Sequence, residues 1–208
     1  MGAFKYLIAL IIIGVLMYGV SQLLHYHDEE GSELSQTEVP ANMLIYAKED
    51  VKKSYYTTAL EHVDNAITNM RQAELTLDDQ SDIYIEQSIE DLHQIERELR
   101  SGFLFEEDLN ASFAKALNTL AYAYLRVSEA ALAEDQQAEA LQALRIAVNQ
   151  LDYSMRFATG ELFDHEQLLM TSLAKMLEEQ NLNLAKLHPL TEGLEQIMVG
   201  SLETTQAP

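Results

Sequence analysis

Glu90 and His93 have the spacing that comes closest to a metal-binding pattern in this chain. Three positions apart within a helical segment, they lie on one helix face, as the iron ligands of di-iron four-helix bundles do. Such a site also needs a second Glu-x-x-His pair and two further inward glutamates, and no second pair occurs in the sequence. Ile89 and Leu92 form the apolar stripe of this helix, and Glu90 and His93 flank it. We therefore expect Glu90 and His93 on the solvated face of the helix.

Residues 78–82, Asp-Asp-Gln-Ser-Asp, superficially resemble a calcium loop. Ile83 occupies the position where such a loop needs glycine, and Ile89 the position where it needs a bidentate glutamate. The stretch is therefore predicted to be a turn, with Ser81 as the N-cap of the helix that follows.

The histidines of two other segments are also poor candidates for chemistry. Pro189 follows His188 and would disrupt the helix in which phosphate-transferring histidines are usually exposed. His25 and His27 flank a tyrosine beside a long apolar run, which favours a membrane interface over a metal site. With no cysteine, glycine-rich phosphate loop or Gly-x-Ser-x-Gly motif, we predict no catalytic, cofactor-binding or metal-binding residues and no enzyme.

The elements that would position these side chains are all helices. No window alternates with period two, whereas apolar residues recur every three or four positions after Pro40. In the first helix these are Val51, Tyr55, Ala59, Val63, Ile67 and Met70. Helices are predicted over about 42–75, 81–100, 108–132, 138–159, 165–187 and 191–201, with Gly102 ending the second and Pro189 separating the last two.

Two helical hairpins of the chain match one another with a shift of 57 residues, and of 56 after the turn. The shift places Val63 on Leu120, Asp78 on Asp135 and, in the second helices, Ile95 on Leu151. We therefore predict an all-α domain at 42–160 made of two duplicated αα-hairpins, with C-terminal helices at 161–202 packing on it and a disordered tail at 203–208.

Residues 116–152 resemble a lengthened tetratricopeptide repeat. Leu117, Leu120, Ala121 and Tyr124 match the large and small positions of that family's first helix, and Ala140, Leu144 and Ala147 match those of its second. The hairpin is seven residues longer than the family pattern and lacks the closing proline. The resemblance implies a protein-binding scaffold with a groove between helices; without it, the same four helices make an up-down bundle, which we favour because two hairpins are few for a solenoid.

Residues 6–24 form an uncharged apolar run of a length that spans a bilayer. We predict a transmembrane anchor at 1–26 and a flexible tether at 27–41. A cleaved signal sequence is the alternative, because Gly19 and Ser21 are small enough for a cleavage site, although Leu23 and Leu24 continue the apolar run. Lys5 before the run and acidic residues after it predict a single-pass protein of the bacterial inner membrane, with a cytoplasmic N-terminus and a periplasmic domain.

The charge restricts the kind of partner. The chain has 13 Lys and Arg against 34 Asp and Glu, a net charge of −21, so nucleic acids and anionic lipid headgroups are repelled. The charge either attracts a basic protein or simply keeps the domain soluble.

Aromatic residues in connections or beside the core stripes are the candidate partner-binding residues: Phe103, Phe105, Tyr56, Tyr122 and Tyr153. The alternatives are a buried plug for the two phenylalanines and ordinary helix shoulders for the three tyrosines. The leading hypothesis is a membrane-anchored extracytoplasmic scaffold or adaptor that binds another envelope protein, and a homo-oligomer is compatible with it. The alternative is a ligand-binding or sensory bundle, exported if residues 6–24 are cleaved. Exposed Phe103 and Phe105 would favour the adaptor, and a buried polar pocket between the second and fourth helices would favour the ligand.

Overall fold

The structure is a computed structural model that describes residues 36–74, 78–180 and 182–204. Regular structure in these ranges is entirely helical and includes no strand, so the all-α prediction is confirmed for the described chain. The chain divides into two compact units, residues 1–34 and 35–208, and the described residues belong to the second. The predicted span at 6–24 lies outside the described residues, and none of the described helices is long and apolar enough to cross a membrane.

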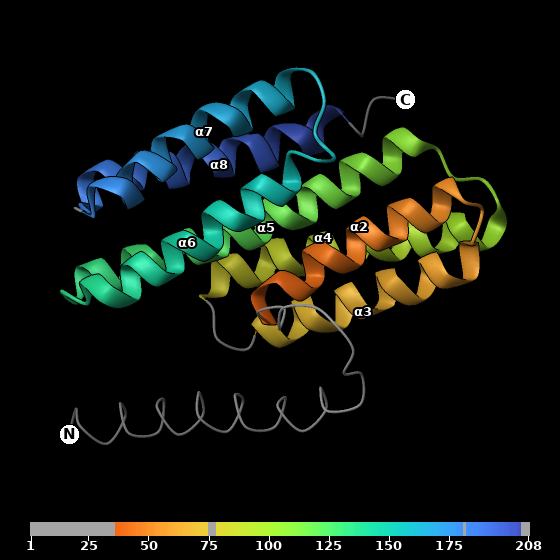
Figure 1. Cartoon of the computed structure of the whole chain (residues 1–208), viewed down its shortest axis with the longest axis horizontal. Helices are drawn as coiled ribbons and strands as arrows, with labels where there is room; N and C mark the ends of the chain where they lie inside the picture. The colour runs from red at the N-terminus through yellow and green to blue at the C-terminus, as the bar shows by residue number, and fades with distance from the viewer. Residues whose placement is uncertain (1–35, 75–77, 181, 205–208) are drawn as a thin grey trace. The chain divides into compact units, whose positions relative to one another are not determined.

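Seven α-helices follow a short 3-10 turn, η2 (Gln36–Glu38), and form an antiparallel bundle (Figure 1). They are α2 (Val39–Lys52), α3 (Tyr56–Glu74), α4 (Asp79–Ser101), α5 (Glu106–Ala133), α6 (Gln137–Ser154), α7 (Glu161–Glu179) and α8 (Leu184–Thr204). The segments predicted to be duplicated hairpins contain the pairs α3–α4 and α5–α6; their duplication stays a prediction.

The first core lies among α2, α3, α4 and the first half of α5. Its largest buried side chains are Leu44, Ile67, Met70, Ile85, Ile89, Leu92, Ile95, Leu109, Phe113 and Leu117. Phe113 also packs edge-on against Phe157, with 5.4 Å between ring centroids, which ties the segment after α6 to this core.

The second core lies among the second half of α5 and α6, α7 and α8. Its buried side chains include Tyr122, Leu125, Leu144, Leu151, Leu173, Leu187, Leu194 and Met198. Fully buried alanines such as Ala121, Ala140 and Ala147 let α5 and α6 approach closely. Since α5 belongs to both cores, the described helices make one compact unit.

Residues on both sides of α4 define its ends. Asp78 is the N-cap, and its Oδ1 accepts hydrogen bonds from the backbone N–H groups of Gln80 and Ser81 at 3.1 and 3.3 Å. The predicted N-cap, Ser81, was wrong by three residues because an aspartate at 78 caps equally well. The predicted stop at Gly102 is confirmed, since this residue adopts a left-handed φ of 74° that favours glycine.

The helix predicted over 42–75 was wrong, because the structure has two helices there. Ser54, with a φ of 63°, reverses the chain, and the N–H of Tyr55 donates to the carbonyl of Asp50 at 2.8 Å. Residues 36–41, predicted to belong to the tether, already form η2 and the first turn of α2, which accepts Pro40 because the N–H groups of a first turn need no helical partner. Apolar spacing continues through the reversal, so periodicity alone did not reveal it.

The break predicted at Pro189 also lies elsewhere. Gln180, with a φ of 49°, ends α7, and Asn183 Oδ1 caps the next helix by accepting from the N–H of Ala185 at 2.8 Å. Pro189 lies inside α8, which continues to Thr204, two residues into the predicted tail; residues 205–208 lie outside the described residues. Leucines on both sides of the true break keep helical spacing, so the sequence across the break resembles that of a single helix.

We predict opposite effects for alanine at two glycines. Gly102→Ala should lower the free energy of unfolding by about 1 kcal/mol, because alanine is strained at a positive φ. Gly200→Ala, inside α8, should raise it by up to about 1 kcal/mol. A Cβ added at either glycine meets no atom within 4 Å, so steric clash does not contribute to the difference between the two variants. Urea unfolding of the full-length protein in detergent measures both, and equal effects would contradict the assigned backbone.

Candidate functional site

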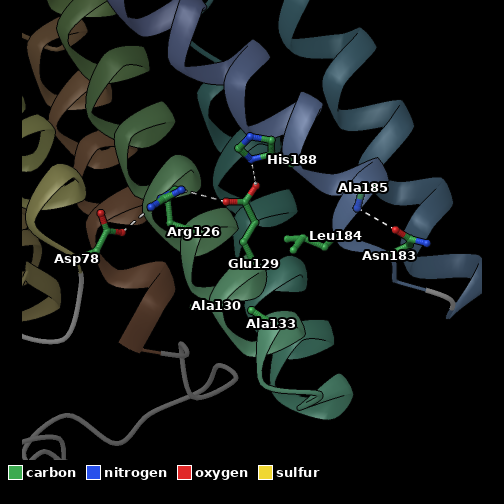
Figure 2. A pocket seen from close by; sticks show the side chains of 9 residues that line it. All are labelled: Asp78, Arg126, Glu129, Ala130, Ala133, Asn183, Leu184, Ala185 and His188. Atoms are coloured by element: carbon green, nitrogen blue, oxygen red, sulfur yellow. Dashed lines mark hydrogen bonds and ion pairs between the residues drawn. The ribbon is translucent and has the colours of Figure 1, made fainter.

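A cleft of about 760 Å³ opens between α5 and α8, beside the start of α4 (Figure 2). It is lined by Asp78, Arg126, Glu129, Ala130, Ala133, Asn183, Leu184, Ala185 and His188. Two helix beginnings, those of α4 and α8, border it. The cleft therefore joins three segments that lie far apart in the sequence.

A chain of ion pairs and hydrogen bonds crosses the cleft (Figure 2). Arg126 Nη1 donates to Glu129 Oε2 at 3.2 Å, and Arg126 Nε lies 3.6 Å from Asp78 Oδ2. Glu129 Oε1 lies 3.1 Å from Nδ1 of His188. The other ring nitrogen of this histidine, Nε2, lies 3.3 Å from Glu192 Oε1. Glu129 is mostly buried and has a partner for each oxygen, so it joins α5 to α8.

The pKa values of two of these groups follow from their surroundings. Burial alone would raise the pKa of Asp78, but hydrogen bonds from Ser81 and the charge of Arg126 lower it below its ordinary value. Burial alone would lower the pKa of Arg126, but the charge of Asp78, with Tyr122 and Glu129, raises it. Both groups are therefore charged at neutral pH and stabilise each other.

The cleft combines charged and apolar groups. Ala130, Ala133 and Leu184 supply an apolar wall beside the charged groups. Among the described residues, the buried Nε of Arg126 has an ion-pair partner, Asp78 at 3.6 Å, but no acceptor at hydrogen-bond distance. Within the described parts of the chain, no group of three or more histidine or acidic side chains is placed to hold a metal ion.

The solvated face predicted for Glu90 and His93 is confirmed at Glu90, whereas the side chain of His93 is only 30% exposed. Glu90 pairs with Arg97 at 3.0 Å and is 69% exposed. His93 Nδ1 lies 2.9 Å from Glu96, and its Nε2 lies 3.3 Å from Arg71 of the neighbouring helix. Glu90 thus forms a surface ion pair, whereas His93 forms hydrogen bonds with Arg71 and with the buried Glu96.

A second polar cluster lies buried where α5, α6 and α7 meet. Asn118 Nδ2 donates to Glu166 Oε1 at 2.6 Å, and Ser154 Oγ donates to the same oxygen at 3.0 Å. Burial of Glu166, which is 0% exposed, raises its pKa to about 7 although both hydrogen bonds oppose the rise. The second carboxyl oxygen has no partner among the described residues, so the ionised form is costly.

Three of the predicted partner-binding residues are well exposed. Phe103 is 78% exposed and Phe105 71%, in the connection between α4 and α5, and Tyr56 is 46% exposed at the start of α3. Tyr153 is only half-buried; it packs against the first core, and Arg156 lies 4.9 Å above its ring. Whether these residues bind a partner stays a prediction.

Tyr122 was wrongly placed at the surface. It is 2% exposed, because α5 is covered on this side by α8 and by Tyr84, whose ring meets it edge-on at 5.4 Å. Tyr55 was wrongly predicted to belong to the core stripe. It is 60% exposed, because the chain reverses at Ser54.

No family model matches this chain, and neither the curated proteins nor the solved structures contain a match to it. The resemblance to tetratricopeptide repeats therefore stays a prediction.

We predict that Glu166→Gln changes how stability depends on pH. The pKa of about 7 in the folded protein lies above the ordinary glutamate value of 4.5, so the contribution of Glu166 to stability is full below about pH 4.5 and is lost as the pH rises through 7. Glutamine has no such loss, so its advantage should grow by up to about 3 kcal/mol between pH 4.5 and 8.

Urea unfolding of both full-length proteins in detergent at several pH values measures this difference. Comparing the two proteins at each pH cancels the titration of the other carboxyl groups. A difference that is the same at every pH would contradict the raised pKa.

Proposed function

We propose that this chain is a membrane-anchored, extracytoplasmic helical scaffold or adaptor that binds another protein of the cell envelope. The observation that carries the proposal is the exposure of four aromatic side chains in two neighbouring connections: Tyr55, Tyr56, Phe103 and Phe105. We call this set the aromatic end. Figure 1 places the α2–α3 turn and the α4–α5 connection at the same end of the bundle.

Exposure of the two phenylalanines is unfavourable unless a partner covers them. Phe103 and Phe105 are each more than 70% exposed, and burying one phenylalanine side chain is worth about 2 kcal/mol. Aromatic residues are enriched in protein–protein interfaces, where a few of them supply most of the binding energy. The two tyrosines add an apolar ring and a hydroxyl that can stay wet.

The proposed location rests on the N-terminal sequence. Residues 6–24 carry no charge and are long enough to span a bilayer as a helix. Lys5 lies before them and Asp28 follows, which favours a cytoplasmic N-terminus. The helical domain would then lie in the periplasm of a bacterium, tethered to the inner membrane.

Ligand binding is the second candidate function, and the cleft between α5 and α8 favours it. Its volume of about 760 Å³ lies within the range of small-molecule sites. For a ligand-binding protein, the sequence predicted a polar pocket between the second and fourth predicted helices. The cleft does not match that prediction, because residues of α5 and α8 line the cleft. We therefore favour the adaptor.

Recovery of a partner with a tagged bait tests the adaptor function. Full-length protein with a C-terminal tag, cross-linked in native membranes, should recover one envelope protein in stoichiometric amount. Phe103→Ser combined with Phe105→Ser should reduce this recovery at least about tenfold, because burial of both rings is lost.

Leu168→Ser combined with Ile83→Ser is the matched control, since these apolar side chains are also exposed, at 68% and 58%, on other helices. This control should recover the partner as well as the unchanged protein does. Equal recovery with both pairs would contradict binding through the aromatic end, and no protein partner at all would favour the ligand-binding alternative.

The intact mass of the same bait tests the anchor. We expect the mass of a chain that retains residues 6–24, because Leu23 and Leu24 continue the apolar run past the small residues of a cleavage site. A mass that lacks the first 21 residues would show a cleaved signal and an exported protein.

A further inference from the structure

The connection between α4 and α5 exposes both of its phenylalanines. Phe103 is 78% exposed, and Phe105, whose backbone is extended with φ −94° and ψ 135°, is 71% exposed. Leu104 between them is partly buried and packs against the first core. Phe103 and Phe105 therefore form an exposed apolar pair on either side of this anchored leucine.

The ends of two helices hold this pair in place. Gly102 ends α4, and the N–H of Phe103 donates to the carbonyl of Glu98 at 3.2 Å. On the other side, the N–H of Leu109 donates to the carbonyl of Phe105 at 3.1 Å, in the first turn of α5. Because the backbone of this connection is already held by hydrogen bonds, binding costs little backbone entropy, which favours affinity.

The two connections of the aromatic end adjoin one another. Leu104 and Leu109 line a hollow of about 180 Å³ together with Val51 and Lys52 of α2. The turn that carries Tyr55 and Tyr56 begins directly after Lys52 and Lys53. The exposed rings from both connections can therefore be contacted by one surface of a partner.

The charge around the aromatic end determines which kind of partner surface can bind there. Residues 49–57 and 101–108 contain five carboxylates and two lysines, and a third lysine, Lys48, lines the hollow together with Glu106. Glu106, Glu107 and Asp108 follow Phe105 directly and are exposed. A second copy of the chain, which has the same excess of acidic residues, or an anionic membrane would meet repulsion here, whereas a basic surface would meet attraction.

We infer that the aromatic end binds a partner protein whose surface has neighbouring apolar pockets for Phe103 and Phe105, bordered by lysine or arginine side chains that face Glu106 and Glu107. The inference rests on the proposed function and specifies the partner's chemistry. The apolar pair supplies most of the affinity, and the carboxylates set orientation and rate of association.

Site-specific photo-cross-linking of the full chain in native membranes tests this inference. The probe is p-benzoylphenylalanine, placed singly at 103, at 105 and, as a control, at the exposed position 168 on α7. We expect the same protein adduct from 103 and 105 and none from 168. Raising NaCl from about 50 to about 500 mM should reduce the adduct about fivefold or more, because screening weakens rim charges.

Charge neutralisation gives the second readout. Glu106→Gln with Glu107→Gln should reduce the adduct severalfold and remove most of its dependence on salt. Glu178→Gln with Glu179→Gln, a pair of exposed glutamates at the end of α7, changes the net charge equally and should leave the adduct unchanged. Melting followed by circular dichroism checks that each variant is folded, and the salt dependence of the unchanged protein needs no variant.

The outcomes separate the inference from the proposed function. A salt-sensitive adduct whose cross-linked partner peptide lies beside lysine or arginine residues supports the inference. A protein adduct that ignores both salt and neutralisation overturns the basic surface and leaves the adaptor function standing. An adduct with a second copy or with lipid overturns the inference. So does the absence of an adduct at 103 and 105, and the recovery of a partner by the tagged bait then decides separately whether the adaptor function survives.

Discussion

The rest of the described structure depends on the burial of α5. This helix has 28 residues and is about 42 Å long, so one element can contribute to two cores placed one after the other. Its first half packs with α2, α3 and α4, and its second half with α6, α7 and α8. Buried alanines along it let neighbouring helices come close, which favours dispersion contacts on several faces.

A helix covered on several faces must satisfy its polar side chains through its neighbours. Asn118 bonds to Glu166 of α7, Ser128 Oγ donates to the carbonyl of Ala140 in α6 at 2.9 Å, and Glu129 pairs with His188 of α8. Each contact joins α5 to a different helix. The cleft and the buried carboxyl cluster are thus both consequences of polar groups on α5 that need partners.

The aromatic end depends on α5 in another way. The antiparallel arrangement puts the α2–α3 turn and the α4–α5 connection at one end of the bundle (Figure 1). Leu104 packs against the first core, and Phe103 and Phe105 on either side of it are exposed. Exposure of these rings follows from packing at a neighbouring residue, so the proposed function is linked to the fold.

The sequence by itself determined the helical class, the inward stripe of α4 at Ile89 and Leu92, the stop at Gly102 and the solvated position of Glu90, because these follow from local spacing and backbone preference. Tertiary structure alone decided the reversal at Ser54, the break before Asn183 and the burial of Tyr122. Apolar spacing continues across both breaks, and only the packing of distant helices decides where the chain turns. The pairing of Glu129 with His188 likewise joins residues 59 positions apart, and no local pattern specifies which distant side chains meet.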